Sequence, residues 1–104
     1  MKAHYSVILT TTSSKEEAQK IALSLVECKL AACVQMVPIQ SCYRWQGEIV
    51  NDAEVLLIIK AKREQYKEIE AAILENHSYE IPEIIEIPFE NGFAPYLQWI
   101  SGNG

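Results

Sequence analysis

The chain has 104 residues, of which 49% are hydrophobic and 22% are charged, and its formal net charge is -5. These values are typical of one globular domain, here residues 1–104, with a single hydrophobic core of modest size. They disfavour nucleic-acid binding, because phosphate recognition needs a basic patch and the only arginines are Arg44 and Arg63.

The N-terminal residues and the cysteines indicate where in the cell the protein is expected. No apolar run approaches the ~20 residues of a membrane span, and the N-terminal residues do not show the charged and long apolar segments of a secretion signal. We therefore expect a cytoplasmic protein without a membrane partner. Cys28, Cys33 and Cys42 form no CxxC pair, which disfavours a zinc ribbon or a thioredoxin-like redox site. The simpler interpretation is that all three are small, buried hydrophobic side chains in a reducing compartment.

The first two predicted elements are a strand and a helix. Tyr5 to Thr10 is rich in β-branched and apolar residues, which predicts a strand. Ser14 and Glu17 have the spacing of a capping box, in which the serine side chain accepts from the backbone N–H of the glutamate and the glutamate reaches back. A helix is expected to follow, since apolar residues repeat at three and four: Ala18, Ile21, Ala22, Leu25 and Val26.

A long β-hairpin follows. One strand is expected to begin near Leu30 and to run to Trp45, and Gln46-Gly47 provides the turn. The returning strand, Glu48 to Ala61, is apolar on both faces at its centre, as in a central strand. In the first arm the apolar side chains stand at even-numbered positions up to Met36 and at odd-numbered positions from Ile39 onward. This change predicts a bulge or kink near Val37-Pro38.

The arms of this hairpin are roughly twice as long as ordinary strands. At about 3.3 Å per residue they would extend beyond a sheet built from strands of usual length. Tyr43 and Trp45 near the tip are too apolar to form an exposed patch, and bare strand edges invite pairing. We therefore predict that other copies of the same chain cover the overhanging part.

Three further elements complete the chain. Arg63 to Asn76 predicts a second amphipathic helix, and Glu80 to Phe89 alternates as a strand whose prolines favour a sheet edge. Pro95 suits the first turn of a short C-terminal helix. The order β-α-β-β-α-β with a terminal helix predicts an α+β, ferredoxin-like antiparallel sheet. Both long helices should lie on one face, and the other face should lack a cover.

Five short motifs, taken in order along the chain, carry a family resemblance. They are Leu30 to Val34, Tyr43-x-Trp45-x-Gly47-Glu48, Glu54 with Lys60, His77-x-Tyr79-x-x-Pro82-Glu83, and Tyr96-Leu97-x-Trp99. Together they resemble the CutA family of divalent-cation tolerance proteins over nearly the whole chain. The resemblance implies a homotrimer of ferredoxin-like subunits, a cytoplasmic location in bacteria, and a role in tolerance to copper and other divalent metals. It implies no known enzymatic reaction, and we expect none.

The resemblance also implies candidate metal ligands. Family metal binding is associated with cysteines and with adjacent histidines before the fourth strand, and of these Cys33 and His77 are present here. Other positions of that set are occupied by Thr10, Ala72 and Asn76. Because copper favours thiolate and imidazole, Cys33 and His77 are candidate ligands for copper or another divalent cation, within one chain or between symmetry-related copies. The structural alternatives are a helix-end cap for His77 and a core position for Cys33.

A set of polar and aromatic residues forms a second candidate site. Glu54 and Lys60 share a parity on their strand, and Glu83 interrupts a row of isoleucines, so these charges should be paired or lie at an interface. One interpretation is a network of ion pairs and hydrogen bonds between subunits, and the other is a polar pocket that accepts a small ligand or cation. Trp45 and Trp99 are expected to be interface anchors. The full set is Tyr43, Trp45, Glu48, Glu54, Lys60, Tyr79, Glu83 and Trp99.

Two other functions occur on folds of this class. A trimeric signalling or scaffolding module, similar to the nitrogen-regulatory PII proteins, would bind a small ligand or a protein partner at subunit interfaces, but the hairpin has no comparable flexible insertion. An acylphosphatase-type enzyme would need glycines and an arginine in a phosphate-binding loop after the first strand. This chain has Thr10 to Ser14 there, which helix capping explains more simply.

Overall fold

The computed structural model describes residues 4–104 and contains one sheet and three α-helices. Residues 1–3 lie outside this range, and they include part of the N-terminal stretch for which the sequence predicts no secretion signal. The elements follow the predicted order: β1 (Tyr5–Thr12), α1 (Lys15–Glu27), β2 (Cys33–Trp45), β3 (Glu48–Lys62), a short 3-10 turn (Arg63–Gln65), α2 (Tyr66–Asn76), β4 (Ile84–Phe89) and α3 (Ala94–Asn103). The α+β, ferredoxin-like prediction is confirmed.

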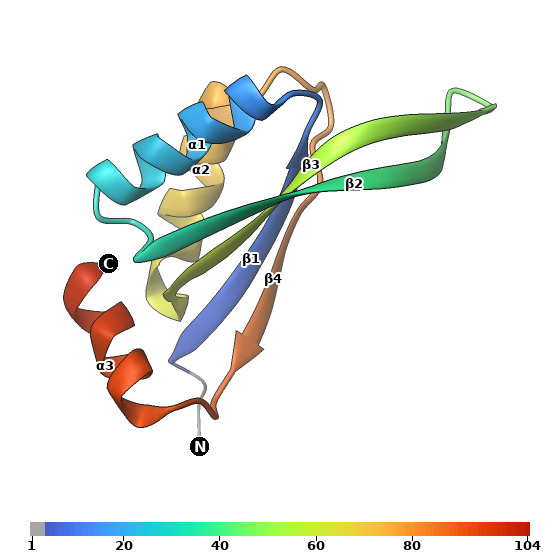
Figure 1. The fold of residues 1–104 in the computed structure, drawn as a ribbon. Helices are drawn as coiled ribbons and strands as arrows, with labels where there is room; N and C mark the ends of the chain where they lie inside the picture. The colour runs from blue at the N-terminus through green and yellow to red at the C-terminus, as the bar shows by residue number, and fades with distance from the viewer. Residues whose placement is uncertain (1–3) are drawn as a thin grey trace.

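The sheet is antiparallel throughout, with the strand order β2-β3-β1-β4 (Figure 1). As predicted, β3 is a central strand and the proline-containing β4 lies at an edge. Strand β1 pairs with β3 only from Val55 to Lys62, so residues Glu48 to Glu54 pair with β2 alone. This unshared part is the overhang that the strand lengths predict, and it leaves the body of the molecule in Figure 1.

The hairpin closes through a two-residue turn. Gln46 and Gly47 have φ values of 50° and 81°, which is the pair of positive angles that a type I′ turn requires. Glycine reaches this region without the steric penalty of a side chain, so Gly47 is the residue that makes the tight turn favourable.

Helices α1 and α2 cover one face of the sheet and bury the core (Figure 1). Residues opposite each other in an antiparallel pair point to the same side, so Ile8 of β1 and Ile59 of β3 both face the helices. They pack against a buried stripe from α1 and α2 that includes Ile21, Leu25, Ile69 and Ile73. Removal of these side chains from water is the main term that holds the two layers together.

Only one of the two hydrogen bonds of the predicted capping box forms at the start of α1. Ser14 accepts from the backbone N–H of Glu17 at 3.1 Å, as the spacing predicts. The glutamate does not reach back to the cap. Its carboxylate instead accepts from the backbone N–H and hydroxyl of Ser78, at 2.8 and 3.2 Å. Glu17 therefore ties the first turn of α1 to the loop between α2 and β4.

Two predicted strand starts are wrong. Strand β2 begins at Cys33 rather than near Leu30, because the N–H groups of Leu30 and Ala31 both donate to the carbonyl of Leu25 at the end of α1. Strand β4 begins at Ile84 rather than Glu80. The carbonyl of Thr11, which an extended β4 would approach, accepts from the side chain of His77.

The predicted bulge at Val37-Pro38 is also absent. Strands β2 and β3 keep one register along their whole length, with Val37 opposite Leu56 and Pro38 opposite Val55. The parity change has a different cause. Val34 packs on the helix-side core, whereas Ile39 lies opposite Glu54 on the other side of the sheet. The more enclosed side of the strand therefore switches where the helices end.

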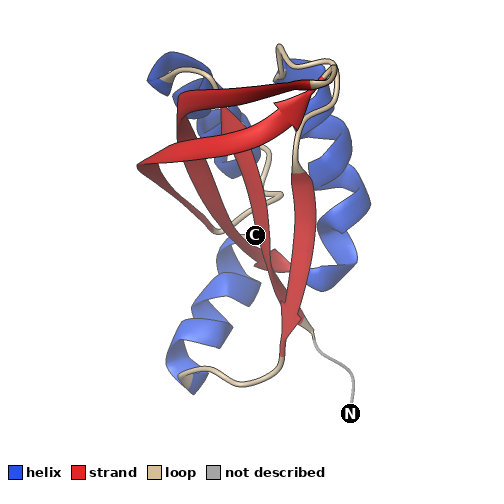
Figure 2. Cartoon of the chain, turned by 90° about the vertical axis from the view of Figure 1, so that its right-hand side faces the viewer, coloured by secondary structure: helices blue, strands red, loops and turns tan. Residues whose placement is uncertain are grey.

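The face of the sheet away from α1 and α2 is turned toward the viewer in Figure 2. Leu9, Ile58 and Ile85 lie next to one another across three strands on this face. Ile85 and its neighbour Ile87 are 47% and 48% exposed. We call this surface the open face. It is apolar where an antiparallel sheet that meets water is usually polar. The prediction of an uncovered side holds around Leu9 and Ile85, while at the other end of the face Tyr5 is bonded to Ser101 of α3.

Candidate functional site

A pocket of about 660 Å³ lies between the hairpin and the loop that connects α2 to β4. Its size falls in the range of small-molecule sites. Most of the lining comes from one side of the hairpin and from the loop: Thr11, Ser41, Cys42, Tyr43, Trp45, Glu54, Ser78, Tyr79, Glu80, Ile81 and Glu83. We call it the hairpin pocket.

The loop that forms one wall is held by His77. Because a carbonyl can only accept, the Nε2–H of His77 donates to the oxygen of Thr11 at 2.6 Å. The other ring nitrogen, Nδ1, accepts from the backbone N–H of Tyr79 at 3.1 Å. Both nitrogens of the neutral ring are therefore used, and together with the bond from Ser78 to Glu17 they fix the loop against β1 and α1.

Two tyrosine–carboxylate pairs define the polar part of the site. The hydroxyl of Tyr79 donates to Oε2 of Glu54 at 2.5 Å, and Glu54 is only 8% exposed. The hydroxyl of Tyr43 donates to Oδ2 of Asp52 at 2.6 Å. Burial and then the bond to Glu54 raise the pKa of Tyr79. The bond to Asp52 is the largest cause that raises the pKa of Tyr43 to about 12. Both phenols are thus protonated donors at neutral pH.

These shifts predict a loss of stability in alkali. An unfolded tyrosine ionises near 10.0, whereas the pKa of Tyr43 and that of Tyr66 are both raised to about 12 in the folded chain. A raised pKa favours the protonated folded state, so this contribution is complete below pH 10 and disappears as the pH rises toward 12. The thermal midpoint, measured by circular dichroism, should fall across this window, and Tyr66→Phe should make the fall shallower. A midpoint independent of pH in this window would contradict the prediction.

The structure brings together part of the predicted polar and aromatic set. Tyr43, Trp45, Glu54, Tyr79 and Glu83 all line the hairpin pocket. Three other members lie elsewhere.

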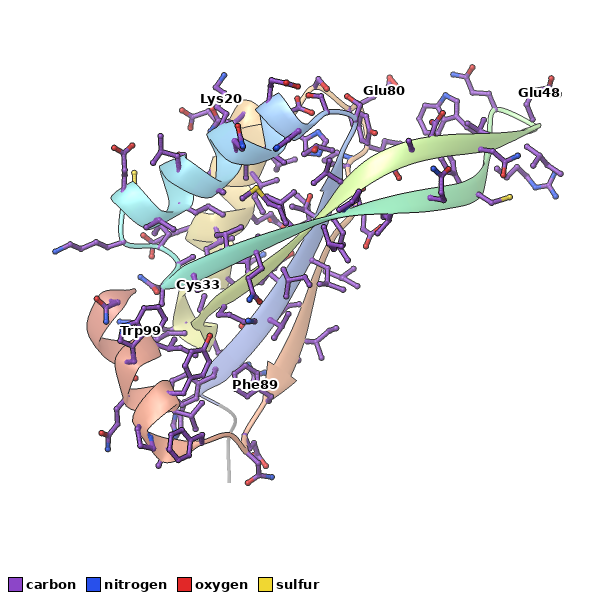
Figure 3. The ribbon with its side chains drawn as sticks, viewed as in Figure 1. Lys20, Cys33, Glu48, Glu80, Phe89 and Trp99 are labelled. Carbon is purple, nitrogen blue, oxygen red and sulfur yellow. The ribbon has the colours of Figure 1, made fainter. Side chains whose placement is uncertain are left out.

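Glu48 stands at the hairpin tip opposite Trp45 (Figure 3). Lys60 donates to Gln35 Oε1 at 2.6 Å, and Trp99 stacks on Tyr96 in α3 with ring centroids 5.7 Å apart.

Sequence reasoning missed several residues that shape the site. Asp52, which holds Tyr43, has the same parity as Glu54 on β3, and that spacing is a signal that could have identified it. Glu17 and Thr11 hold the loop through bonds across 61 and 66 residues of sequence. No local pattern indicates contacts of this kind.

The two candidate metal ligands lie at different places. Cys33 is opposite Lys60, which in turn is opposite Val7 of β1, whereas His77 contacts Thr11. Val7 and Thr11 are four residues apart on one strand, or roughly 13 Å. Figure 3 shows Cys33 at the start of β2, far from Glu80 in the loop. Within residues 4–104, no three His, Cys, Asp or Glu side chains are placed to hold a metal ion. A single chain therefore does not assemble the predicted ligand pair. The predicted burial of all three cysteines is wrong, since Cys28 and Cys42 are exposed and Cys33 is half-buried.

None of the helices in the described range has the length and hydrophobicity to cross a membrane.

Comparison with known proteins gives consistent matches. The family model for the CutA1 divalent ion tolerance protein matches residues 6–103. A divalent-cation tolerance protein CutA from Thermus thermophilus is 43% identical over 98 residues, which cover 93% of this chain and 95% of that protein. The crystal structure of the stable protein CutA1 from Shewanella sp. SIB1 has a TM-score of 0.95 and 42% identity, covering 100% of this chain and 98% of that one.

The names of relatives contradict the expected cytoplasmic location. A structural relative from Archaeoglobus fulgidus is described as the periplasmic divalent cation tolerance protein CutA, with a TM-score of 0.93, 39% identity, and coverage of 95% of this chain and 97% of that one. A relative from Arabidopsis thaliana is named as chloroplastic; it is 39% identical over 93% of this chain and 54% of its own length. The prediction of a plainly cytoplasmic protein is therefore withdrawn.

The family that the five motifs resemble is the one that these comparisons find, and the PII-like alternative is not favoured by them. The chain belongs to the family of CutA1 divalent ion tolerance proteins.

Proposed function

We propose that this protein acts in tolerance to divalent metal ions as a homotrimer, and as a binding protein rather than an enzyme. The observation that carries the proposal is the open face, where Ile85 and Ile87 are about half exposed beside Leu9 and Ile58. Large apolar surfaces of this kind mark interaction sites, because soluble single chains rarely leave them in water.

The overhang supports other copies of the chain as the partner. A two-stranded hairpin is marginally stable when nothing packs on it, yet residues Glu48 to Glu54 pair with β2 alone. Tyr43 and Trp45 on this part are 38% and 40% exposed. A symmetric assembly can cover the open face and the overhang of every copy with the same contacts. The number of three comes from the family resemblance.

Binding rather than catalysis fits the chemistry of the hairpin pocket. The phenols of Tyr43 and Tyr79 have raised pKa values and donate to carboxylates, so they do not act as bases near neutral pH. They are suited to holding fixed hydrogen bonds.

Direct copper binding is the second part of the proposal, with Cys33 as the ligand. Cys33 is a free, half-buried thiol on the open face, so copies that pack there bring it to an interface between chains. Thiolate is a preferred ligand of copper(I). His77 supports the proposal less well, because a metal would have to displace one of its two hydrogen bonds.

Titration of the assembled protein with copper(I), in competition with a chelator and without oxygen, tests this part. Cys33→Ser should lose the tightest copper, whereas Cys42→Ser, a change at an exposed cysteine of the same strand, should keep it. Equal copper stoichiometry in Cys33→Ser and the unmodified protein would remove Cys33 from the site.

A further inference from the structure

We propose that the hairpin pocket binds a small organic cation, namely an ammonium or guanidinium group carried on an apolar body. Glu54, Glu80 and Glu83 contribute three carboxylates to its lining, and the lining residues include no lysine, arginine or histidine. Such a concave surface of one sign attracts ligands of the opposite charge. This inference goes beyond the proposed role in metal tolerance.

The carboxylate of Glu54 gives the pocket a directed acceptor. This side chain is more than nine-tenths buried, and Oε2 accepts the hydrogen bond from Tyr79. Within residues 4–104 no hydrogen bond is made to Oε1, and Glu54 is one of the residues that line the pocket. A charged oxygen in a largely desolvated position is stabilised by an N–H donor of opposite charge.

The rest of the wall suits the apolar part of such a ligand. Tyr43 and Trp45 project from the same side of β2 as Glu54 does from β3, because Tyr43 lies opposite Val50 and Trp45 opposite Glu48. Both aromatic rings are partly exposed in a single chain, and Ile81 of the loop adds an aliphatic surface. A copy that covers the overhang would have to leave the pocket side of these rings free for the ligand to bind. Aromatic faces attract cations and also contact alkyl or aryl groups, so they recognise both halves of the ligand.

A bare metal ion fits the pocket less well. The volume of about 660 Å³ is that of a small-molecule site. Two of the nearby carboxylate oxygens, Glu54 Oε2 and Asp52 Oδ2, already accept from protonated phenols. Within residues 4–104 no three His, Cys, Asp or Glu side chains are placed to hold a metal ion together, whereas an ammonium group does not need such a set of ligands.

Calorimetric titration of the full-length, assembled protein with phenethylammonium chloride tests this inference, and neutral 2-phenylethanol serves as the matched ligand. The ammonium compound should bind saturably and at least about tenfold more tightly than the alcohol. Glu54→Gln should weaken ammonium binding by about tenfold, because the amide keeps an acceptor for Tyr79 but removes the charge. Glu64→Gln, at an exposed glutamate outside the pocket, should leave binding unchanged.

Glu83→Gln provides a second variant, because Glu83 is exposed at the pocket and its change should leave the fold intact. It should weaken ammonium binding severalfold. Equal binding of the two ligands, or unaltered ammonium binding by both Glu54→Gln and Glu83→Gln, would overturn the inference. So would an absence of saturable binding, as expected if a basic side chain of a second copy fills the pocket. Sedimentation measured on the same sample separates the test of this inference from the test of the proposed trimer. If the protein sediments as a single chain and still binds the ammonium ion, only the proposed trimer is contradicted.

Discussion

Ile85→Glu is expected to dissociate the protein into single chains. Ile85 lies on the open face beside Leu9 and is 47% exposed in one chain, so a carboxylate there meets water when the chain is alone. In an assembly that covers this face, the same carboxylate would be buried without a partner. That costs several kcal/mol, and every ~1.4 kcal/mol changes an association constant tenfold. Sedimentation velocity should therefore show the mass of one chain.

Leu23→Glu is the matched control for this change. Leu23 lies on α1, outside the helix-side core, and is 59% exposed. The same added charge there should leave the sedimentation coefficient unaltered. The assembly through the open face would be refuted if Ile85→Glu sedimented like the unmodified protein while circular dichroism showed a normal fold.

Tyr79→Phe is expected to lower the free energy of unfolding by about 1–3 kcal/mol. The change removes the donor to Glu54, a carboxylate that is only 8% exposed and that water reaches poorly. A buried acceptor without its partner carries the full desolvation penalty. Urea denaturation at one fixed protein concentration measures the effect, because the apparent stability of an oligomer depends on concentration.

Tyr43→Phe tests the same chemistry at a wetter position. It also removes a donor to a carboxylate, but Asp52 is more exposed than Glu54, so water can take the place of the phenol. The loss of stability should be clearly smaller than for Tyr79→Phe. Equal losses would mean that burial of Glu54 is not the cause, and no loss at Tyr79 would contradict the account of the pair.

Much of the fold could be predicted because it follows from the periodicity of the sequence. The repeat of Ile21, Leu25 and their neighbours at three and four identifies the face of α1 that is buried. The length of the two arms around Gln46-Gly47 predicts an overhang, since the strand on the other side of β3, β1, is too short to pair with all of it. Both features depend on local sequence alone.

The errors arise where distant residues compete with local pattern. Residues 80–83 alternate as a strand would, but the carbonyl of Thr11 is bonded to His77 instead. The parity change near Pro38 indicates a bulge only if one side of the strand stays buried along its length. In the structure the enclosed side changes from the helices to the hairpin pocket.

The candidate site could be predicted in part. The sequence places Tyr43, Glu54 and Tyr79 in one candidate set, and all three line one pocket in the structure. Lys60 was grouped with Glu54 by parity alone. Parity determines the face of a strand but not the position along it. Glu54 lies just before the part of β3 that pairs with β1, whereas Lys60 lies toward the far end of that part.

Native mass spectrometry of the unmodified protein at micromolar concentration tests the central claim, which is that copies of this chain cover one another's open faces. One dominant species with three times the 11.8 kDa mass of a single chain is the expected result. A stable and soluble species of 11.8 kDa as the main form would contradict it.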